Sequence, residues 1–440
     1  MRRWVLVLVG VGAIAAAAAC YVLIAGQGDR VLASAEGLLA AARPPIVVGI
    51  LYSQAGPMAI SERSLIDAEV LALEEVNLRG GIDGRPVRWA IGDGRSDPST
   101  FAAEARRLIE AEKVCVIFGC YTADDRKAVR AVVEQHGSIL FLAANFEGME
   151  PSARVIHAGG SANQSVGPSV RWAVDTLKAR RFYLAGSDEL WSRSALEIAR
   201  DAVKASGGEV VGESFLPVGG SDVGPMVEAI RASRADAILG AIVGDSNVPF
   251  YRELRRAGLT PDKVPVISYS VGEDEVRAMA PGDVAGHYSA WNYFQSLDRD
   301  ENRAFVRRFR GKYGESRVTG DAIVAAYDGV MLWAQAANEA GTVAPRTVFD
   351  YLGRQSLNAP DGIISIDSAT RIVWRPFHVG RARADGQFDI VWSIDKPIHP
   401  LLYTPTRTRA QWRAFVAGIR GRPAPAGGST GPPPAPAPPR

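Results

Sequence analysis

Residues 47–57 read VVGILYSQAGP, an apolar run rich in β-branched residues that passes directly into a polar turn. A short apolar run bounded by Gly and Pro is typical of a buried strand. Residues 61–79 then repeat apolar side chains at helical spacing, and Gly80 ends that helix because glycine tolerates left-handed C-cap geometry. A second β-branched run follows at residues 87–92. This strand–helix–strand order predicts a parallel α/β sheet.

The same alternation continues for about 250 residues and predicts two lobes. The further strands are predicted at residues 114–119, 139–144, 182–186, 237–243 and 264–270, with helices that include 192–206 and 248–258. One strand–helix series runs to about His157 and a second begins near Ser161. Two doubly wound, Rossmann-like lobes are therefore expected. After Gly286 the pattern predicts helices at 298–313 and 321–340, then a hairpin of residues 377–383 and 387–393.

The N-terminal residues predict a membrane segment. Arg2 and Arg3 precede an uncharged apolar run from Trp4 to Gly26, which at 1.5 Å per residue is long enough to cross a hydrocarbon layer of ~30 Å. Three outcomes remain open: a retained anchor helix, lipidation at Cys20, and cleavage as a signal peptide. Each of the three exports the residues that follow.

Composition and charge exclude several classes of function. The 440 residues contain 50 Lys and Arg against 48 Asp and Glu, a net charge of +2, which is too balanced for a surface that neutralises nucleic acid. Three cysteines in this length do not make a disulfide framework. The five histidines form no metal-type pair on a helix. No nucleotide loop or Gly-x-Ser-x-Gly elbow is complete. We therefore expect no catalytic residues, no metal, no cofactor and no enzymatic activity.

Polar and aromatic clusters follow the predicted strands directly. They lie at residues 53–57, 121–124, 145–147, 188–191, 244–247 and 270–273. Ligands of open α/β sheets bind outside the carboxyl ends of the strands. The clusters of both lobes are therefore expected to line one cleft that binds a small molecule.

The chain resembles the exported solute-binding proteins of ABC transporters, in the group that binds branched-chain amino acids, amides and urea. The resemblance extends over residues 46–393 and rests on these motifs: VGIL at 48–51, GG at 80–81 with GRP at 84–86, FGCY at 118–121, RKAV at 126–129, FEG at 146–148, GSD at 186–188, GDSNVPFY at 244–251, SVGE at 270–273, AWNYF at 290–294 and DGQF at 385–388. It implies a type I periplasmic binding fold, in which two lobes joined by a three-strand hinge close on a ligand. It also implies an ABC permease as partner and a location at the periplasmic face of the inner membrane. A ligand sensor or scaffold with a signalling partner is the alternative function, since one fold serves both roles.

The resemblance also suggests which residues bind the ligand. The expected ligand-binding residues are Ser53, Tyr121, Thr122, Ala123, Leu142, Ala144, Asn145, Trp191, Asp245 and Ser270. Where relatives that bind amides or urea carry hydroxyl groups, this chain has Ala123, Leu142 and Trp191. Burying an unpaired amide costs ~1–3 kcal/mol for each missing hydrogen bond. The pocket is therefore expected to prefer a ligand with an apolar or flat portion over urea.

The expected organisation of the chain follows from these patterns. It has seven parts: a signal or membrane anchor at 1–26, a spacer at 27–45, the first part of lobe 1 at 46–160, the first part of lobe 2 at 161–286, a return mainly to lobe 1 at 287–375, a return to lobe 2 with a C-terminal extension at 376–420, and a Pro-rich tail at 421–440 that is expected to be disordered.

Overall fold

The structure, a computed structural model, describes residues 44–420. The membrane segment predicted at residues 4–26 and the predicted disordered tail at 421–440 lie outside these residues. Between residues 44 and 420, no helix has both the length and the apolar character that crossing a bilayer requires.

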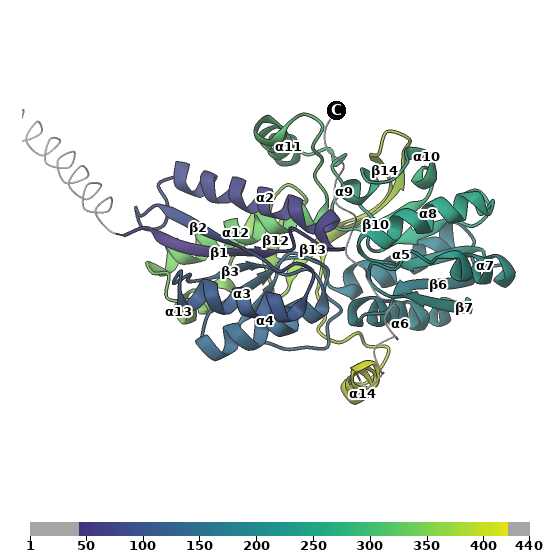
Figure 1. The fold of residues 1–440 in the computed structure, drawn as a ribbon, viewed down its shortest axis with the longest axis horizontal. Helices are drawn as coiled ribbons and strands as arrows, with labels where there is room; N and C mark the ends of the chain where they lie inside the picture. The colour runs from purple at the N-terminus through teal and green to yellow at the C-terminus, as the bar shows by residue number, and fades with distance from the viewer. Residues whose placement is uncertain (1–43, 421–440) are drawn as a thin grey trace, which may run out of the picture.

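The first sheet is parallel and has five strands. Its order is β2 (Val87–Asp93), β1 (Ile46–Tyr52), β3 (Ile117–Gly119), β4 (Leu140–Leu142) and β5 (Val155–His157). Helices cover both faces, which explains why β1 is buried along almost its whole length. Figure 1 shows α2 and α12 on one side of this sheet and α3 and α4 on the other. The bounds of these helices are Ala59–Leu78, Asp321–Ala340, Pro98–Glu110 and Ala123–His136.

The second sheet has nine strands and is partly antiparallel. Its order is β11 (Ser356–Ala359), β12 (Gly362–Ile366), β13 (Val373–Ala382), β10 (Tyr288–Trp291), β9 (Val266–Ser268), β8 (Ala237–Ala241), β6 (Arg181–Ser187) and β7 (Glu209–Leu216), with β14 (Phe388–Ile398) paired to β13. Strands β10, β9, β8, β6 and β7 are parallel neighbours. The helices around them are α5 (Ala162–Thr176), α6 (Leu190–Ala205), α7 (Gly224–Ser233), α8 (Asn247–Arg256), α9 (Glu273–Val276) and α10 (Pro281–Val284), with the short 3-10 helix η1 (Gly244–Ser246) before α8.

We call the body around the first sheet lobe 1 and the body around the parallel strands of the second sheet lobe 2. Each lobe has an apolar core on both faces of its sheet. Lobe 1 is completed by α11 (Asp300–Tyr313), α12 and α13 (Pro345–Leu352). This is the two-lobed α/β fold that the sequence predicts.

Strand β13 connects the two lobes. Its first residues pair with β12, where Val373 lies opposite Ile366, and its later residues pair with β10, where His378 lies opposite Trp291. Just before β13, Ile372 forms a bridge to His157 of β5. One continuous strand therefore runs from the edge of lobe 1 into the sheet of lobe 2.

Several strands were missing from the sequence prediction. These are β5, β7, β10, β11 and β12. Strand β10 begins just after the predicted boundary at residue 286 and pairs with β9, so it extends the sheet of lobe 2. Strand β7 is at the edge of its sheet and half exposed, which explains its weak apolar pattern. The predicted helices and the predicted hairpin are present, with ends shifted by a few residues.

The described chain ends in helix α14 (Arg409–Arg420), which packs against α6 of lobe 2. Trp412 is fully buried in the lobe 2 core, and its indole N–H donates to the Thr404 carbonyl oxygen at 3.0 Å. Arg407 lies over the Trp412 ring and pairs with Glu197 and Asp201 of α6. The C-terminal extension is thereby attached to the helix that begins beside the interlobe cavity described next.

Candidate ligand-binding site

A cavity lies between the two lobes, at the carboxyl ends of their parallel strands. Its ten lining residues are Tyr121, Thr122, Ala144, Asn145, Glu189, Trp191, Val243, Tyr269, Ser270 and Trp291. They follow β3 and β4 of lobe 1 and β6, β8 and β9 of lobe 2, and Trp291 ends β10. The cavity is narrow: the space between its walls measures about 330 Å³ with the part open to solvent included.

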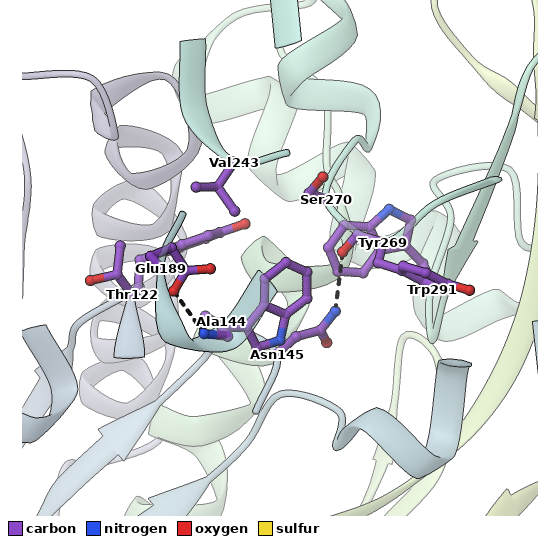
Figure 2. Close-up of a pocket in the computed structure, with 10 residues that line it drawn as sticks. Thr122, Ala144, Asn145, Glu189, Val243, Tyr269, Ser270 and Trp291 are labelled. Atoms are coloured by element: carbon purple, nitrogen blue, oxygen red, sulfur yellow. Dashed lines mark hydrogen bonds between the residues drawn. The ribbon is translucent and has the colours of Figure 1, made fainter. Parts of the chain in front are cut away.

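Two aromatic residues of lobe 2 present ring surface to this cavity. The indole N–H of Trp291 donates to the Val271 carbonyl oxygen at 2.8 Å, and the Tyr269 hydroxyl is 3.1 Å from the Ser169 hydroxyl. Their polar atoms are therefore satisfied elsewhere in the protein. Figure 2 shows Tyr269 and Trp291 on one side of the space and Glu189 and Val243 on the other. The walls are thus mainly apolar.

Glu189 is the one carboxylate among the lining residues. It is the N-cap of α6, and its side-chain oxygens accept the backbone N–H groups of Trp191 at 2.8 Å and Ser192 at 2.5 Å. Its side chain is almost fully buried. Burial raises the pKa of Glu189 to about 7, although the hydrogen bonds from Ser192 and Trp191 oppose the shift. The carboxyl group therefore changes its charge near neutral pH.

Thr122 lines the cavity where α4 begins. As N-cap, its hydroxyl oxygen accepts the Asp125 N–H at 3.2 Å, and its hydroxyl donates to the Asp125 carboxylate. Asp124 also lies in the first turn of α4. These acidic side chains face the partial positive charge of the helix N-terminus.

Asn145 and Ser270 supply further polar groups from opposite lobes. The Ser270 hydroxyl donates to the Ile242 carbonyl oxygen at 2.5 Å. The Asn145 amide N–H reaches the Tyr269 carbonyl oxygen only at 3.5 Å, as the dashed line in Figure 2 marks. Its side-chain oxygen is buried and has no hydrogen-bond partner within residues 44–420. Since buried polar atoms are normally paired, this oxygen can accept a hydrogen bond from a ligand.

The structure brings six of the ten expected residues together around this cavity. They are Tyr121, Thr122, Ala144, Asn145, Trp191 and Ser270.

The other four expected residues lie outside the lining of the cavity. The Ser53 hydroxyl oxygen accepts the Ser96 N–H at 2.9 Å within lobe 1. Ala123 is the buried first residue of α4, and Leu142 ends β4 with its side chain in the core. Asp245 lies in η1, where its N–H donates to the Pro57 carbonyl oxygen at 3.2 Å across the lobes.

The expected set lacked four lining residues: Glu189, Val243, Tyr269 and Trp291. The sequence contained a signal for each of them. Glu189 belongs to the cluster at 188–191, Trp291 to the AWNYF motif, and Val243 and Tyr269 to the ends of predicted strands. The residues that directly follow the strands, and in the case of Trp291 the last residue of β10 itself, line the cavity.

Comparisons with known proteins agree with this geometry. The family described as "periplasmic binding protein domain" matches residues 46–409. Leu/Ile/Val-binding protein homolog 7 of Brucella suis biovar 1 is 23% identical over 314 residues, which cover 66% of this chain and 77% of that protein. A shorter match, to limonene hydroxylase of Geobacillus stearothermophilus, is 38% identical over 114 residues and covers 26% of this chain and 21% of that protein.

Solved structures share the fold. A solute-binding protein of an ABC transporter from R. palustris, in complex with 4-hydroxybenzoate, superposes with a TM-score of 0.72 at 23% identity, covering 81% of this chain and 98% of that one. The matched family and such fold neighbours are substrate-binding proteins and not enzymes. With a family match over residues 46–409 and a cavity between two α/β lobes, this chain belongs to the periplasmic binding protein family.

Proposed function

We propose that this protein is an exported, membrane-tethered solute-binding protein that captures a small organic ligand with an apolar or flat portion and presents it to an ABC permease. The observation that carries the proposal is the aromatic lining of the interlobe cavity, where Trp291 ends β10, Tyr269 follows β9 and Trp191 lies in the first turn of α6. A flat group placed between such rings loses its contact with water and gains aromatic contacts worth ~1–3 kcal/mol.

The structural neighbour from R. palustris supports a flat ligand, since it was solved with 4-hydroxybenzoate. A urea-like ligand fits this cavity less well. The hydroxyls of Thr122 and Ser270 already donate to Asp125 and Ile242, so few free polar groups remain to pair with a small polar amide.

Both lobes contribute to the cavity, which links binding to closure. Thr122 and Asn145 come from lobe 1, and Glu189 and Ser270 come from lobe 2. A ligand makes all of these contacts only when the lobes are close together, so it favours the closed arrangement. When the lobes close by bending at the connections between them, the binding protein takes a shape that a permease can distinguish from the ligand-free shape.

The tether rests on the N-terminal sequence. The uncharged run from Trp4 to Gly26 continues past Cys20 with four apolar residues, which favours a retained anchor over lipidation. We expect the full-length protein to sediment with membranes, and Cys20→Ser to leave this unchanged. A soluble mature protein that begins after Gly26 would contradict the tether. If the unsubstituted protein is labelled by lipid and Cys20→Ser loses that label, the tether is a lipid on Cys20 and not a retained helix.

The binding function is tested by a thermal-shift screen followed by titration. Aromatic acids, aromatic amines, amino acids, amides and urea are the ligand classes, because a ligand that binds only the folded state raises the melting temperature. For a ligand found in this way, Trp191→Ala should weaken binding by ~1–3 kcal/mol, which is roughly 5- to 160-fold in Kd.

Trp89→Ala is the matched control. Trp89 lies in β2, away from the cavity, so its removal should leave Kd unchanged. Equal affinity of Trp191→Ala and the unsubstituted protein, or micromolar binding of urea, would contradict this account of the pocket.

A further inference from the structure

The charged groups around the cavity determine which charge the polar end of the ligand can carry. Within the described part of the chain, the residues that line the cavity include one carboxylate, Glu189, and no lysine or arginine. A buried ligand carboxylate would therefore meet no cationic side chain in the wall and would lie near Glu189. Burying an ion without a partner is strongly unfavourable.

The N-termini of helices α4 and α6 at the cavity are already matched with acidic groups. Glu189 caps α6 with its own carboxylate, and Asp124 and Asp125 occupy the first turn of α4. A free helix N-terminus is a ready site for an anion. Here the partial positive charge of each terminus already faces a carboxylate, so neither offers such a site.

The nearest guanidinium groups on these elements are also engaged. Arg126 of α4 is buried and contacts Glu147 at 2.5 Å and Glu150 at 2.9 Å. Arg193 of α6 contacts Asp188 at 2.5 Å and lies over a phenylalanine ring. Turning either arginine toward a ligand would leave its present carboxylate partner unpaired.

The aromatic walls favour a positive charge. A cation near the face of a tryptophan or tyrosine ring is attracted by the negative charge of that face, more strongly when water is excluded. Trp191, Trp291, Tyr269 and Tyr121 all line this cavity together with Glu189. The Asn145 side-chain oxygen, which has no partner among residues 44–420, adds a neutral acceptor.

We propose that the polar end of the ligand is an organic cation, an ammonium group on a small apolar or flat body, held between the Glu189 carboxylate and the aromatic walls. This inference rests on the proposed function and names the substrate class of the same cavity. It separates this protein from a binder of benzoate-like anions.

The test compares three probes that share one ring and differ in charge: benzylamine, benzyl alcohol and benzoate. Isothermal titration at pH 8 should give the tightest binding for benzylamine, at least tenfold tighter than benzyl alcohol, with benzoate the weakest. The common ring holds the apolar contacts constant, so the order of affinity reports the charge preference of the cavity.

Glu189→Gln keeps the size of the side chain and one oxygen that can cap α6. It should remove the preference for benzylamine over benzyl alcohol, so that the two probes bind the variant with similar affinity. Binding of the neutral probe thus also shows that the variant is folded. Asp188→Asn is the matched control, because it removes a carboxylate next in sequence that does not line the cavity; it should keep the preference.

The outcomes separate the two proposals. If benzyl alcohol or benzoate binds as tightly as benzylamine, the inference is overturned and the proposed function stands. If Asp188→Asn abolishes the preference as fully as Glu189→Gln, recognition by Glu189 is overturned. If none of the three probes binds, the cation inference is overturned, and if the wider screen also finds no ligand, the proposed function fails with it.

Discussion

Glu189 combines a structural and a chemical role in one side chain. It closes the first turn of α6 by accepting two backbone N–H groups, and it is also part of the cavity wall. The charged groups around it are Glu147, whose charge further raises the pKa of Glu189, and the ion pair of Asp188 with Arg193. The protonation state of this carboxyl group is therefore set mainly by its burial, and it responds to pH in the physiological range.

We expect the affinity for an organic cation to depend on pH through Glu189. Because burial raises the pKa of Glu189 to about 7, the carboxylate is mostly ionised at pH 8 and mostly protonated at pH 6. Only the ionised form attracts a cation. The Kd of benzyltrimethylammonium, whose own charge does not titrate, should therefore be about tenfold higher at pH 6 than at pH 8.

The measurement is a series of titrations between pH 5.5 and 8.5 with a correction for buffer ionisation. In Glu189→Gln the Kd should not change with pH. A Kd that falls as the pH is lowered, or an equal pH dependence in the Gln variant, would show that another group controls binding.

The sequence predicted part of this site for a physical reason. Residues that follow buried parallel strands must emerge at one edge of the sheet, which correctly placed Tyr121, Thr122 and Asn145 at the cavity. The position along a strand does not reveal where each side chain points. Ser53 also follows a strand, yet its hydroxyl bonds to the Ser96 N–H within lobe 1.

At the scale of elements, the long central helices and strands were predictable because their apolar residues repeat at regular spacing. Helix α12 is an example, with predicted and observed bounds that agree. Strands β5 and β10, of three and four residues, were missed, whereas β3, β4 and β9, of three residues each, were predicted because longer apolar runs contain them. In such strands the pairing with neighbours, and not the local pattern, decides the structure.

Helix α14 gives a prediction at this scale. Among the side chains of this helix that the structure describes, Trp412 is the one that is fully buried, and replacing a buried tryptophan by alanine costs roughly 3–5 kcal/mol. Trp412→Ala should detach α14 from α6, since few other residues of the helix are well covered. Limited trypsin digestion should then cut at Arg413 faster than in the unsubstituted protein.

Ala414→Ser, an exposed change on the same helix, is the control and should leave the cleavage rate unaltered. Equal cleavage rates for Trp412→Ala and the unsubstituted protein would mean that the remaining contacts hold α14: the ion pairs of Arg407 with α6 and the packing of Phe415, Val416 and Ile419 against the lobe 2 core.

At the scale of the whole molecule, the two lobes meet through the cavity and through strands that run between them. Figure 1 shows the two bodies side by side with β13 extending across their junction. Asp245 and Asn145 each make a contact from one lobe to the other, to Pro57 and Tyr269. Met58 and Ala123 of lobe 1 also pack against the core of lobe 2, so separating the lobes breaks these contacts while most of each core stays intact.

Ligand should therefore make the protein more compact. Small-angle scattering of the protein at saturating ligand should give a smaller radius of gyration than the free protein, because bound ligand contacts both lobes only when they are closed. Trp191→Ala at the same ligand concentration should show a smaller change. An unchanged radius at proven saturation would count against hinge closure and in favour of a preformed cavity.

The cavity wall is assembled from short neighbouring groups of residues, each at the end of a different strand: Tyr121 with Thr122, Ala144 with Asn145, Glu189 with Trp191, and Tyr269 with Ser270. Most side chains of the two cores lie within the strands and helices behind these groups, but Trp191 and Tyr269 belong both to the cavity wall and to the core of lobe 2. After a gene duplication, substitutions at wall residues outside these cores, such as Thr122, Asn145 and Ser270, can therefore change the ligand of one copy while the inherited framework stays intact. Diversification of such binders requires only a few mutations at a time, each acceptable to the folded protein.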